Sequence, residues 1–134
     1  MNTPFETAQP TTPGTVSGAP RLILQAEGAA VLALSLWAYA AMGGHWGLFA
    51  ALFLAPDLFM LGYLSGPRIG SSAYNLGHTY MVALAVAALG YALAQPLGLQ
   101  IGLIWVAHIG FDRMIGYGLK YSHDFKATHL SNAR

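Results

Sequence analysis

Four apolar stretches, each close to twenty residues long, fill most of this 134-residue chain. They run from about residue 21 to 42, 46 to 64, 71 to 94 and 97 to 116. A helix needs roughly 20 apolar residues to cross the hydrocarbon core of a bilayer, and the many Ala, Leu and Gly residues are typical of helices that pack closely in lipid. A transmembrane barrel would alternate polar and apolar residues over about ten residues, which these stretches do not. The pattern predicts an all-α, four-helix transmembrane bundle.

The low number of charged residues supports this interpretation. Only 8% of the residues are charged, with six Lys and Arg against five Asp and Glu, whereas a soluble domain carries about 25%. So few charges cannot cover a water-facing surface, and the near-neutral balance excludes a nucleic-acid binder that works through phosphate contacts. The absence of cysteine excludes disulfide scaffolds and thiolate metal sites.

Residues 1–20 differ from the rest because they are rich in Pro and Thr and have no apolar periodicity. We expect this segment to be a disordered tail, and residues 21–134 to form one four-helix domain that ends in a short C-terminal segment. The breaks between the stretches are short, so successive helices should be antiparallel neighbours.

The basic residues predict the orientation in the membrane. With four spans, both termini and the second loop share one side, and all the Lys and Arg residues outside the spans lie there: Arg21, Arg68, Lys120, Lys126 and Arg134. Basic residues favour the cytoplasmic side. We therefore expect a multi-pass inner-membrane protein with both termini in the cytoplasm.

Ionisable side chains inside a span are costly and mark functional sites. At about 1.5 Å per residue, Glu27, Asp57, His78 and His108 each lie roughly 9–12 Å from the cytoplasmic end of their stretch, with Asp112 nearer to it. Their common depth predicts one buried polar site, open toward the cytoplasm. His108 and Asp112 share a helix face because they are four residues apart, and Pro56 should kink the chain beside Asp57.

Two imidazoles and several carboxylates form a plausible ligand set for a divalent metal. We expect His78, His108, Asp57 and Asp112 to be the ligands, with Asn75 and His129 as outer supports. Zinc, manganese or iron suits these donors, and zinc is the leading candidate.

Three functions stay open. The first is a metal-dependent, hydrolase-like enzyme that acts on a lipid-like or small amphiphilic substrate among the membrane lipids, with Glu27 as general base and Arg113 holding an anionic group. The second is a small proton-coupled transporter. The third is a non-catalytic structural or partner-binding membrane protein, in which Arg113 neutralises an acid while His78 and Asn75 bond across helices.

The C-terminal segment, residues 117–130, mixes aromatic residues with His123 and His129. It either folds back under the helices and brings His129 near His108, or lies along the headgroups with its aromatic side chains.

The chain resembles a small bacterial membrane family known as domain of unknown function 4260, from about Pro20 to Leu130. The resemblance rests on short runs in a fixed order: 55–63 (APDLFMLGY), 66–68 (GPR), 74–80 (YNLGHTY), 108–113 (HIGFDR), 116–121 (GYGLKY) and 128–130 (THL). It implies a compact multi-span inner-membrane protein and no particular activity. The runs contain every residue of the predicted site except Glu27.

Overall fold

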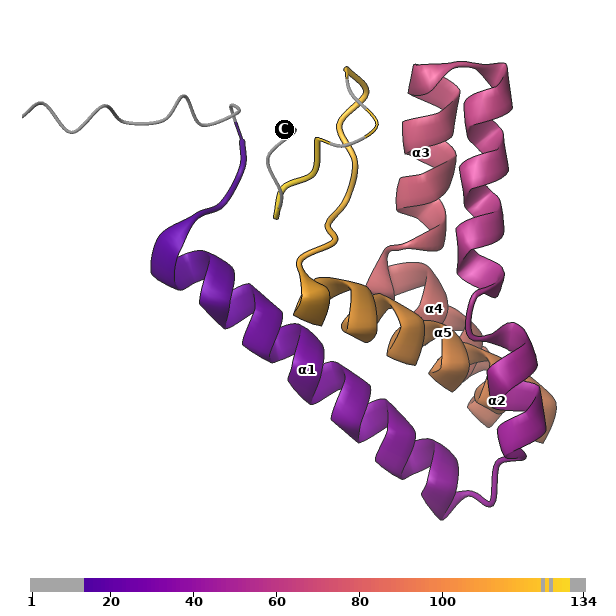
Figure 1. Cartoon of the computed structure of the whole chain (residues 1–134). Helices are drawn as coiled ribbons and strands as arrows, with labels where there is room; N and C mark the ends of the chain where they lie inside the picture. Colours follow the sequence, from indigo (N-terminus) through magenta and orange to yellow (C-terminus); the bar gives the residue numbers. More distant parts are fainter. Residues whose placement is uncertain (1–13, 124, 126, 131–134) are drawn as a thin grey trace, which may run out of the picture.

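The computed structural model describes residues 14–123, 125 and 127–130, and all regular structure within them is helical (Figure 1). The elements follow in the order α1 (Gly18–Ala41), α2 (Trp46–Leu52), the 3₁₀ helix η1 (Ala55–Ser65), α3 (Pro67–Gly77), α4 (Tyr80–Ala92) and α5 (Pro96–Ile115). The predicted all-α class is confirmed. The first and last predicted spans correspond to the continuous helices α1 and α5.

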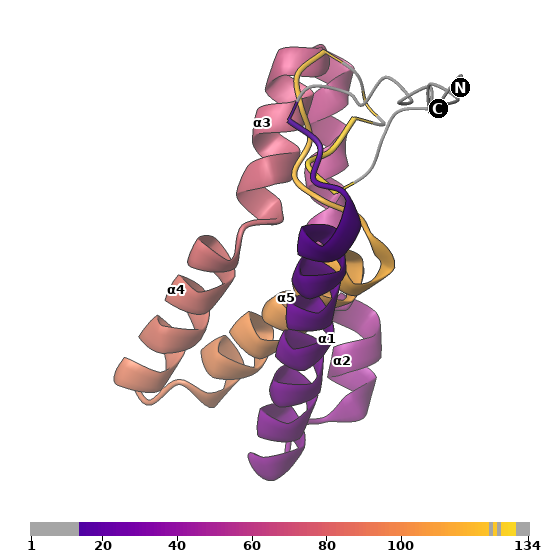
Figure 2. The ribbon, with the colours of Figure 1, turned by 90° about the vertical axis from the view of Figure 1, so that its left-hand side faces the viewer.

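Helix α5 lies between α1 and α4 and packs against both (Figures 1 and 2). Glycines permit the close approach of the backbones: a Cβ atom on Gly110 would lie 2.8 Å from the backbone nitrogen of Leu32, and one on Gly28 would lie 2.8 Å from the Gly110 carbonyl oxygen. Such contacts between small residues are typical of helix pairs in lipid. They hold the half of α5 that carries His108 and Asp112 against its neighbours.

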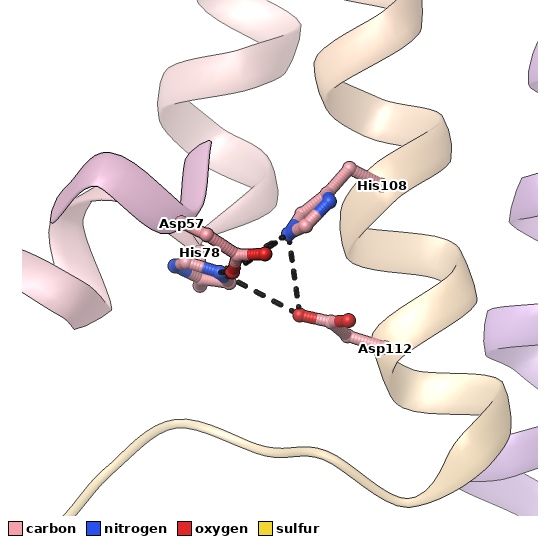
Figure 3. A group of neighbouring side chains, drawn as sticks. All are labelled: Asp57, His78, His108 and Asp112. Atoms are coloured by element: carbon pink, nitrogen blue, oxygen red, sulfur yellow. Dashed lines mark hydrogen bonds and ion pairs between the residues drawn. The ribbon is translucent and has the colours of Figure 1, made fainter. Parts of the chain in front are cut away.

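The second apolar stretch changes helix type at the predicted kink. The α-helix ends at Leu52, and a 3₁₀ helix runs from Ala55 to Ser65 with Pro56 in its first turn. Pro56 has no N–H to continue an α-helix, and the Asp57 N–H donates instead to the Leu54 carbonyl at 3.1 Å. The bend places Asp57 at the start of η1, where it faces α5 (Figure 3).

The third apolar stretch is two helices, which corrects the expectation of one helix over residues 71–94. Helix α3 ends at Gly77 and α4 begins at Tyr80. The carbonyls that would continue the helical ladder bond to side chains: Tyr74 to the His78 ring at 2.8 Å, and Gly77 to the Trp105 N–H at 2.6 Å. Tertiary bonds to polar side chains thus replace helical bonds, and hydropathy alone does not reveal them.

Most of the predicted disordered tail, residues 1–13, lies outside the described residues. The remainder, residues 14–20, is ordered, and α1 already begins at Gly18. The Val16 N–H donates to the His129 carbonyl at 2.8 Å, and the Tyr121 hydroxyl donates to the Gly14 carbonyl at 2.8 Å. These partners are more than a hundred residues away in the sequence, so local composition could not indicate them.

Different connecting segments lie at the two ends of the molecule. The C-terminal segment and the turn between η1 and α3 lie at the top of both views, whereas the turns from α1 to α2 and from α4 to α5 lie toward the bottom (Figures 1 and 2). Two helical segments, Gly18–Ala41 and Trp46–Ser65, are long and apolar enough to cross a membrane.

Candidate metal centre

Four of the predicted site residues converge on one point (Figure 3). Asp57 comes from the start of η1, His78 from the break between α3 and α4, and His108 and Asp112 from successive turns of α5. One potential ligand atom from each residue lies within 4.8 Å of all the others. The helical break at His78 and the kink at Pro56 are therefore the local features that assemble the cluster.

Five of the six distances between the ligand atoms are close to those of a tetrahedral metal site, and the sixth, between the two carboxylate oxygens, is at most 4.8 Å. Each imidazole Nε2 lies 3.3–3.5 Å from Asp57 Oδ1 and 3.4–3.5 Å from Asp112 Oδ2, and the Nε2 atoms of His78 and His108 lie 3.2 Å apart. A tetrahedral zinc ion with bonds of about 2.0–2.1 Å separates its ligand atoms by about 3.3–3.4 Å. The two imidazoles and either carboxylate are thus spaced as three ligands of one such ion, and the fourth ligand atom lies within 4.8 Å of the other three.

The cluster is buried on three sides and open on the fourth. The side chains of His78, His108 and Asp112 are 0%, 2% and 9% exposed, whereas that of Asp57 is 40% exposed. Water reaches the cluster past Asp57. Burying two carboxylates beside two imidazoles is costly unless a cation compensates for them.

The hydrogen bond of His78 to its own helix fixes its tautomer. Its Nδ1 lies 2.8 Å from the Tyr74 carbonyl oxygen, which can only accept, so Nδ1 carries the hydrogen. Neutral His78 therefore directs the lone pair of Nε2 into the cluster, as a metal ligand does, and a second bond of this kind commonly orients such ligands. The Tyr74 ring also stacks on His78, with the ring centroids 3.7 Å apart.

The surroundings of His108 differ. Phe53 contacts its ring edge-on, with centroids 5.5 Å apart, and its Nδ1 is buried without a hydrogen bond of standard geometry. In a metal-free protein, a hydrogen on His108 Nε2 would face His78 Nε2 and both carboxylates at 3.2–3.5 Å. One hydrogen cannot satisfy three acceptors, whereas a cation at the centre can bind all four atoms.

Arg113 does not neutralise an acid, contrary to the structural-network interpretation. It is buried, and its two terminal nitrogens donate to the Tyr117 carbonyl at 3.0 Å and the His78 carbonyl at 2.9 Å. Within the part of the chain that the structure describes, it forms no salt bridge with a carboxylate. Arg113 thus holds the backbone of the cluster residue His78 and lies over the Tyr80 ring, 6.0 Å from its centroid.

Glu27 is not brought to the cluster. It lies on an exposed face of α1 and lines a separate cavity with Tyr80, Arg113 and His129. The predicted role of Glu27 as the general base of the metal site therefore has no support in the geometry. Glu27 lies about as far from the end of its apolar stretch as most of the cluster residues lie from the ends of theirs. It lies on a side of the α1 axis that borders the other cavity, however.

Asn75 and His129 hold the C-terminal segment in place instead of supporting the cluster directly. The Asn75 amide donates to the Lys120 carbonyl at 2.8 Å and accepts from the Lys120 N–H at 2.6 Å. His129 Nδ1 accepts from the Leu119 N–H at 2.9 Å. Burial, with the positive charge of Arg113, lowers the pKa of His129 below its ordinary value. The segment thus folds back, with His129 beside Arg113 in the cavity that Glu27 also lines.

Two supporting residues escaped the sequence analysis. The backbone carbonyl of Tyr74 accepts a hydrogen bond from the His78 ring, and the Tyr74 ring stacks on that of His78. The indole N–H of Trp105 donates to the Gly77 carbonyl at the end of α3. The spacing of Tyr74, four residues before His78, was the one available signal, since residues four apart meet on a helix. Nothing in the sequence distinguished Trp105 from an interfacial aromatic residue.

Fold and site together define a small all-α protein with two long apolar helical segments and a buried His/Asp cluster that could hold a metal ion. Residues 21–133 match the family described as domain of unknown function (DUF4260), and the chain belongs to that family. The resemblance found in the sequence is thereby confirmed. Neither a curated protein nor a solved structure matches the chain significantly.

Proposed function

We propose that this protein is a multi-pass membrane protein that binds one divalent metal ion through Asp57, His78, His108 and Asp112, and that it uses the ion for hydrolysis. The observation that carries the proposal is the convergence of four ligand atoms: both Nε2 atoms lie 3.2–3.5 Å from each other and from one oxygen of each carboxylate, and all four atoms lie within 4.8 Å of one another. A polar network can also have such distances, but a hydrogen on one Nε2 atom cannot satisfy the other three acceptors at once, whereas a cation can bind all four atoms.

The exposure of the apolar helices supports a membrane location. In the most apolar windows of Gly18–Ala41 and Trp46–Ser65, only 17% and 6% of the residues are buried. A core helix of a soluble protein would be mostly buried. Large side chains such as Leu64, Met81 and Trp37 are 87%, 81% and 71% exposed, and an aqueous surface rarely tolerates so much contiguous apolar area.

The charges support an orientation. Arg68 lies in the first turn of α3 and Lys120 lies in the C-terminal segment. The η1–α3 turn and the C-terminal segment are at the same end of the molecule (Figure 2). The turns at the opposite end, Met42–His45 and Leu93–Gln95, contain no Lys or Arg. Under the positive-inside rule, the end with the C-terminal segment faces the cytoplasm and the cluster opens toward it.

Zinc fits the cluster best among the divalent ions. The imidazole nitrogens are borderline donors and the carboxylate oxygens are hard donors, and zinc binds both kinds, most often four ligands in a tetrahedron. The absence of cysteine leaves no thiolate to favour softer ions. The short distances disfavour calcium, which takes six to eight oxygen ligands at longer range.

The open side of the cluster supports hydrolysis over a purely structural role. Structural zinc sites are closed, whereas catalytic ones keep a position for water, and a bound zinc ion makes such a water acidic enough to act as a nucleophile near neutral pH. With all four cluster residues bound, a tetrahedral ion would have no free position, so hydrolysis would require one ligand to give way to a water. Asp57, the exposed ligand, is the one that could do so and accept the proton of that water. Glu27 lies elsewhere, so Asp57 replaces it in this role.

Metal analysis of detergent-purified protein tests the proposal. We expect about one zinc ion per chain in the wild type and none in His108→Ala. His123→Ala is the matched control, because His123 is an exposed histidine outside the cluster, and it should keep the ion. Wild-type protein that is folded, yet metal-free after purification with zinc present, would refute the metal site and with it the hydrolase.

A further inference from the structure

The cavity beside the cluster carries two opposite charges that do not pair with each other. It has a volume of about 380 Å³ and is lined by Glu27 from α1, Tyr80 from α4, Arg113 from α5 and His129 from the C-terminal segment. No salt bridge joins Glu27 to Arg113, and Glu27 makes no ion pair with any described residue. A buried cation and an acid on one cavity wall, held apart, point to a ligand that has both an anionic and a cationic group.

Three hydrogen-bond donors surround the anionic position. Arg113 uses two of its five N–H groups on carbonyls, which leaves others free. The Tyr80 hydroxyl is buried and has no hydrogen-bond partner. Because His129 Nδ1 accepts from Leu119, the neutral ring carries its hydrogen on Nε2. A buried hydroxyl without a partner is rare and calls for an explanation, and the Tyr80 hydroxyl would donate to a bound anion once the side chain turned toward the cavity that Tyr80 lines.

The rest of the cavity is apolar and opens along α1. Leu24, Val31 and Leu34 line it, and Leu34 is 64% exposed, so the apolar wall continues onto the outer face of the helix. Small-molecule sites commonly have about 300–1,000 Å³, mostly apolar walls and a few polar groups. A polar headgroup in the cavity with an alkyl chain along α1 fits this arrangement.

We propose that the cavity binds the headgroup of a zwitterionic phospholipid, with its phosphate at Arg113, Tyr80 and His129 and its ammonium group at Glu27. The acyl chains then lie along Leu24, Val31 and Leu34. The proposal rests on the membrane location proposed above and not on the metal ion. Arg113 connects the two sites, because it lines the cavity and bonds to the backbone of the cluster residue His78. The headgroup is therefore held beside the metal cluster, as a substrate or a regulator would be.

Native mass spectrometry of delipidated protein tests the proposal with three probes: dioleoylphosphatidylethanolamine, dioleoylphosphatidylglycerol and free phosphoethanolamine. We expect the first lipid to bind about tenfold more tightly than the second, because a charge-assisted hydrogen bond to the ammonium group is worth 1.5–3 kcal/mol, or roughly tenfold and more. Equal retention of both lipids would overturn the zwitterionic assignment. Free phosphoethanolamine that binds as tightly as the lipid would overturn the assignment to a lipid.

Two conservative variants locate the binding. Glu27→Gln should bind both phospholipids equally, and Tyr80→Phe should weaken both several-fold while the protein stays fully stable, because the hydroxyl has no protein partner to lose. Tyr63→Phe is the matched control: it removes another buried hydroxyl without a partner, but one in η1 outside the cavity, and should bind like the wild type. Unchanged binding in both test variants would refute the site.

Metal content separates this inference from the proposed function. Glu27→Gln and Tyr80→Phe should retain the zinc ion, since neither residue belongs to the cluster. A metal-free wild type that still prefers the zwitterionic lipid would refute the metal site and leave the lipid site standing. A zinc-loaded wild type that shows no preference between the lipids would refute the lipid site and leave the metal site standing.

Discussion

The Nε2 atoms of His78 and His108 lie 3.2 Å apart, although the residues are thirty positions apart and on different elements. His78 has its hydrogen on the far side of the ring, bonded to Tyr74, so at least one lone pair faces the other imidazole and two carboxylates. This concentration of acceptors is unfavourable without a cation or extra protons. The relationship makes the cluster a site that a metal ion stabilises.

The link between Asn75 and Lys120 should control the docking of the C-terminal segment. Asn75→Ala removes two part-buried hydrogen bonds, 2.6 and 2.8 Å long, each worth about 0.5–1.5 kcal/mol. We expect faster amide hydrogen exchange and faster proteolysis within residues 117–130. Ser72→Ala, on the exposed face of the same helix, should change neither. Wild-type protection in Asn75→Ala would show that this link does not hold the segment.

The contact between α1 and α5 should not tolerate a methyl group at Gly110. A Cβ atom there would lie 2.8–2.9 Å from the Leu32 nitrogen and the Gly28 oxygen, which are backbone atoms that cannot move aside independently. Gly110→Ala should lower the melting temperature in detergent by an amount equivalent to about 1–3 kcal/mol. Leu84→Ala, on the exposed face of α4, serves as control. A melting temperature of Gly110→Ala equal to or above that of the wild type would contradict the close contact between α1 and α5.

The docked C-terminal segment should weaken in acid because of His129. Burial and the charge of Arg113 lower the pKa of this residue, so the unfolded chain takes up a proton first as the pH falls through about 6.5. The stability contributed by neutral His129 is therefore complete above that pH and declines below it. Hydrogen exchange of residues 117–130 should accelerate between pH 7 and 5 in the wild type. His129→Gln should reduce this pH dependence, and an unchanged profile in the variant would assign the effect to another group.

The proposed orientation places the C-terminus in the cytoplasm and the Gly43–Gly44 turn on the opposite side. Reporter fusions after Arg134 and within that turn should give opposite compartment signals, because basic residues accompany only the first of these two positions. A fusion after Arg134 that reports the periplasm would reverse the orientation and make the cluster open outward.

The sequence predicted the four cluster residues more accurately than it predicted where the helices begin and end. Asp57, His78, His108 and Asp112 stand out because ionisable groups are rare in apolar stretches, and their depths agree. Depth alone also selected Glu27, which points into another cavity, because a helix presents residues of equal depth on different faces. Rotation about the helix axis depends on packing, such as the contact of Gly28 with Gly110, and the sequence pattern does not specify it.

The helical break at His78 is the main feature that the sequence did not predict. The polar residues gather in the first part of residues 71–94 and the apolar ones from Tyr80 onward, but Thr79 is neither Gly nor Pro, so no local breaker stands between the two helices. The break depends on the Trp105 and Arg113 side chains, which bond to the Gly77 and His78 carbonyls from another helix. Such tertiary bonds override local propensity, and the same bonds orient His78 toward the cluster.

Chelation of the purified wild-type protein tests the central claim most directly. Removal of a zinc ion present at about 100 times its dissociation constant costs about 2.7 kcal/mol, which corresponds to a fall in melting temperature of roughly 10 °C. We expect this fall for the wild type on addition of a chelator and its reversal on addition of excess zinc. Asp112→Ala should melt at a lower temperature that the chelator does not change. A wild type whose melting temperature is the same with chelator and with zinc would contradict the metal centre.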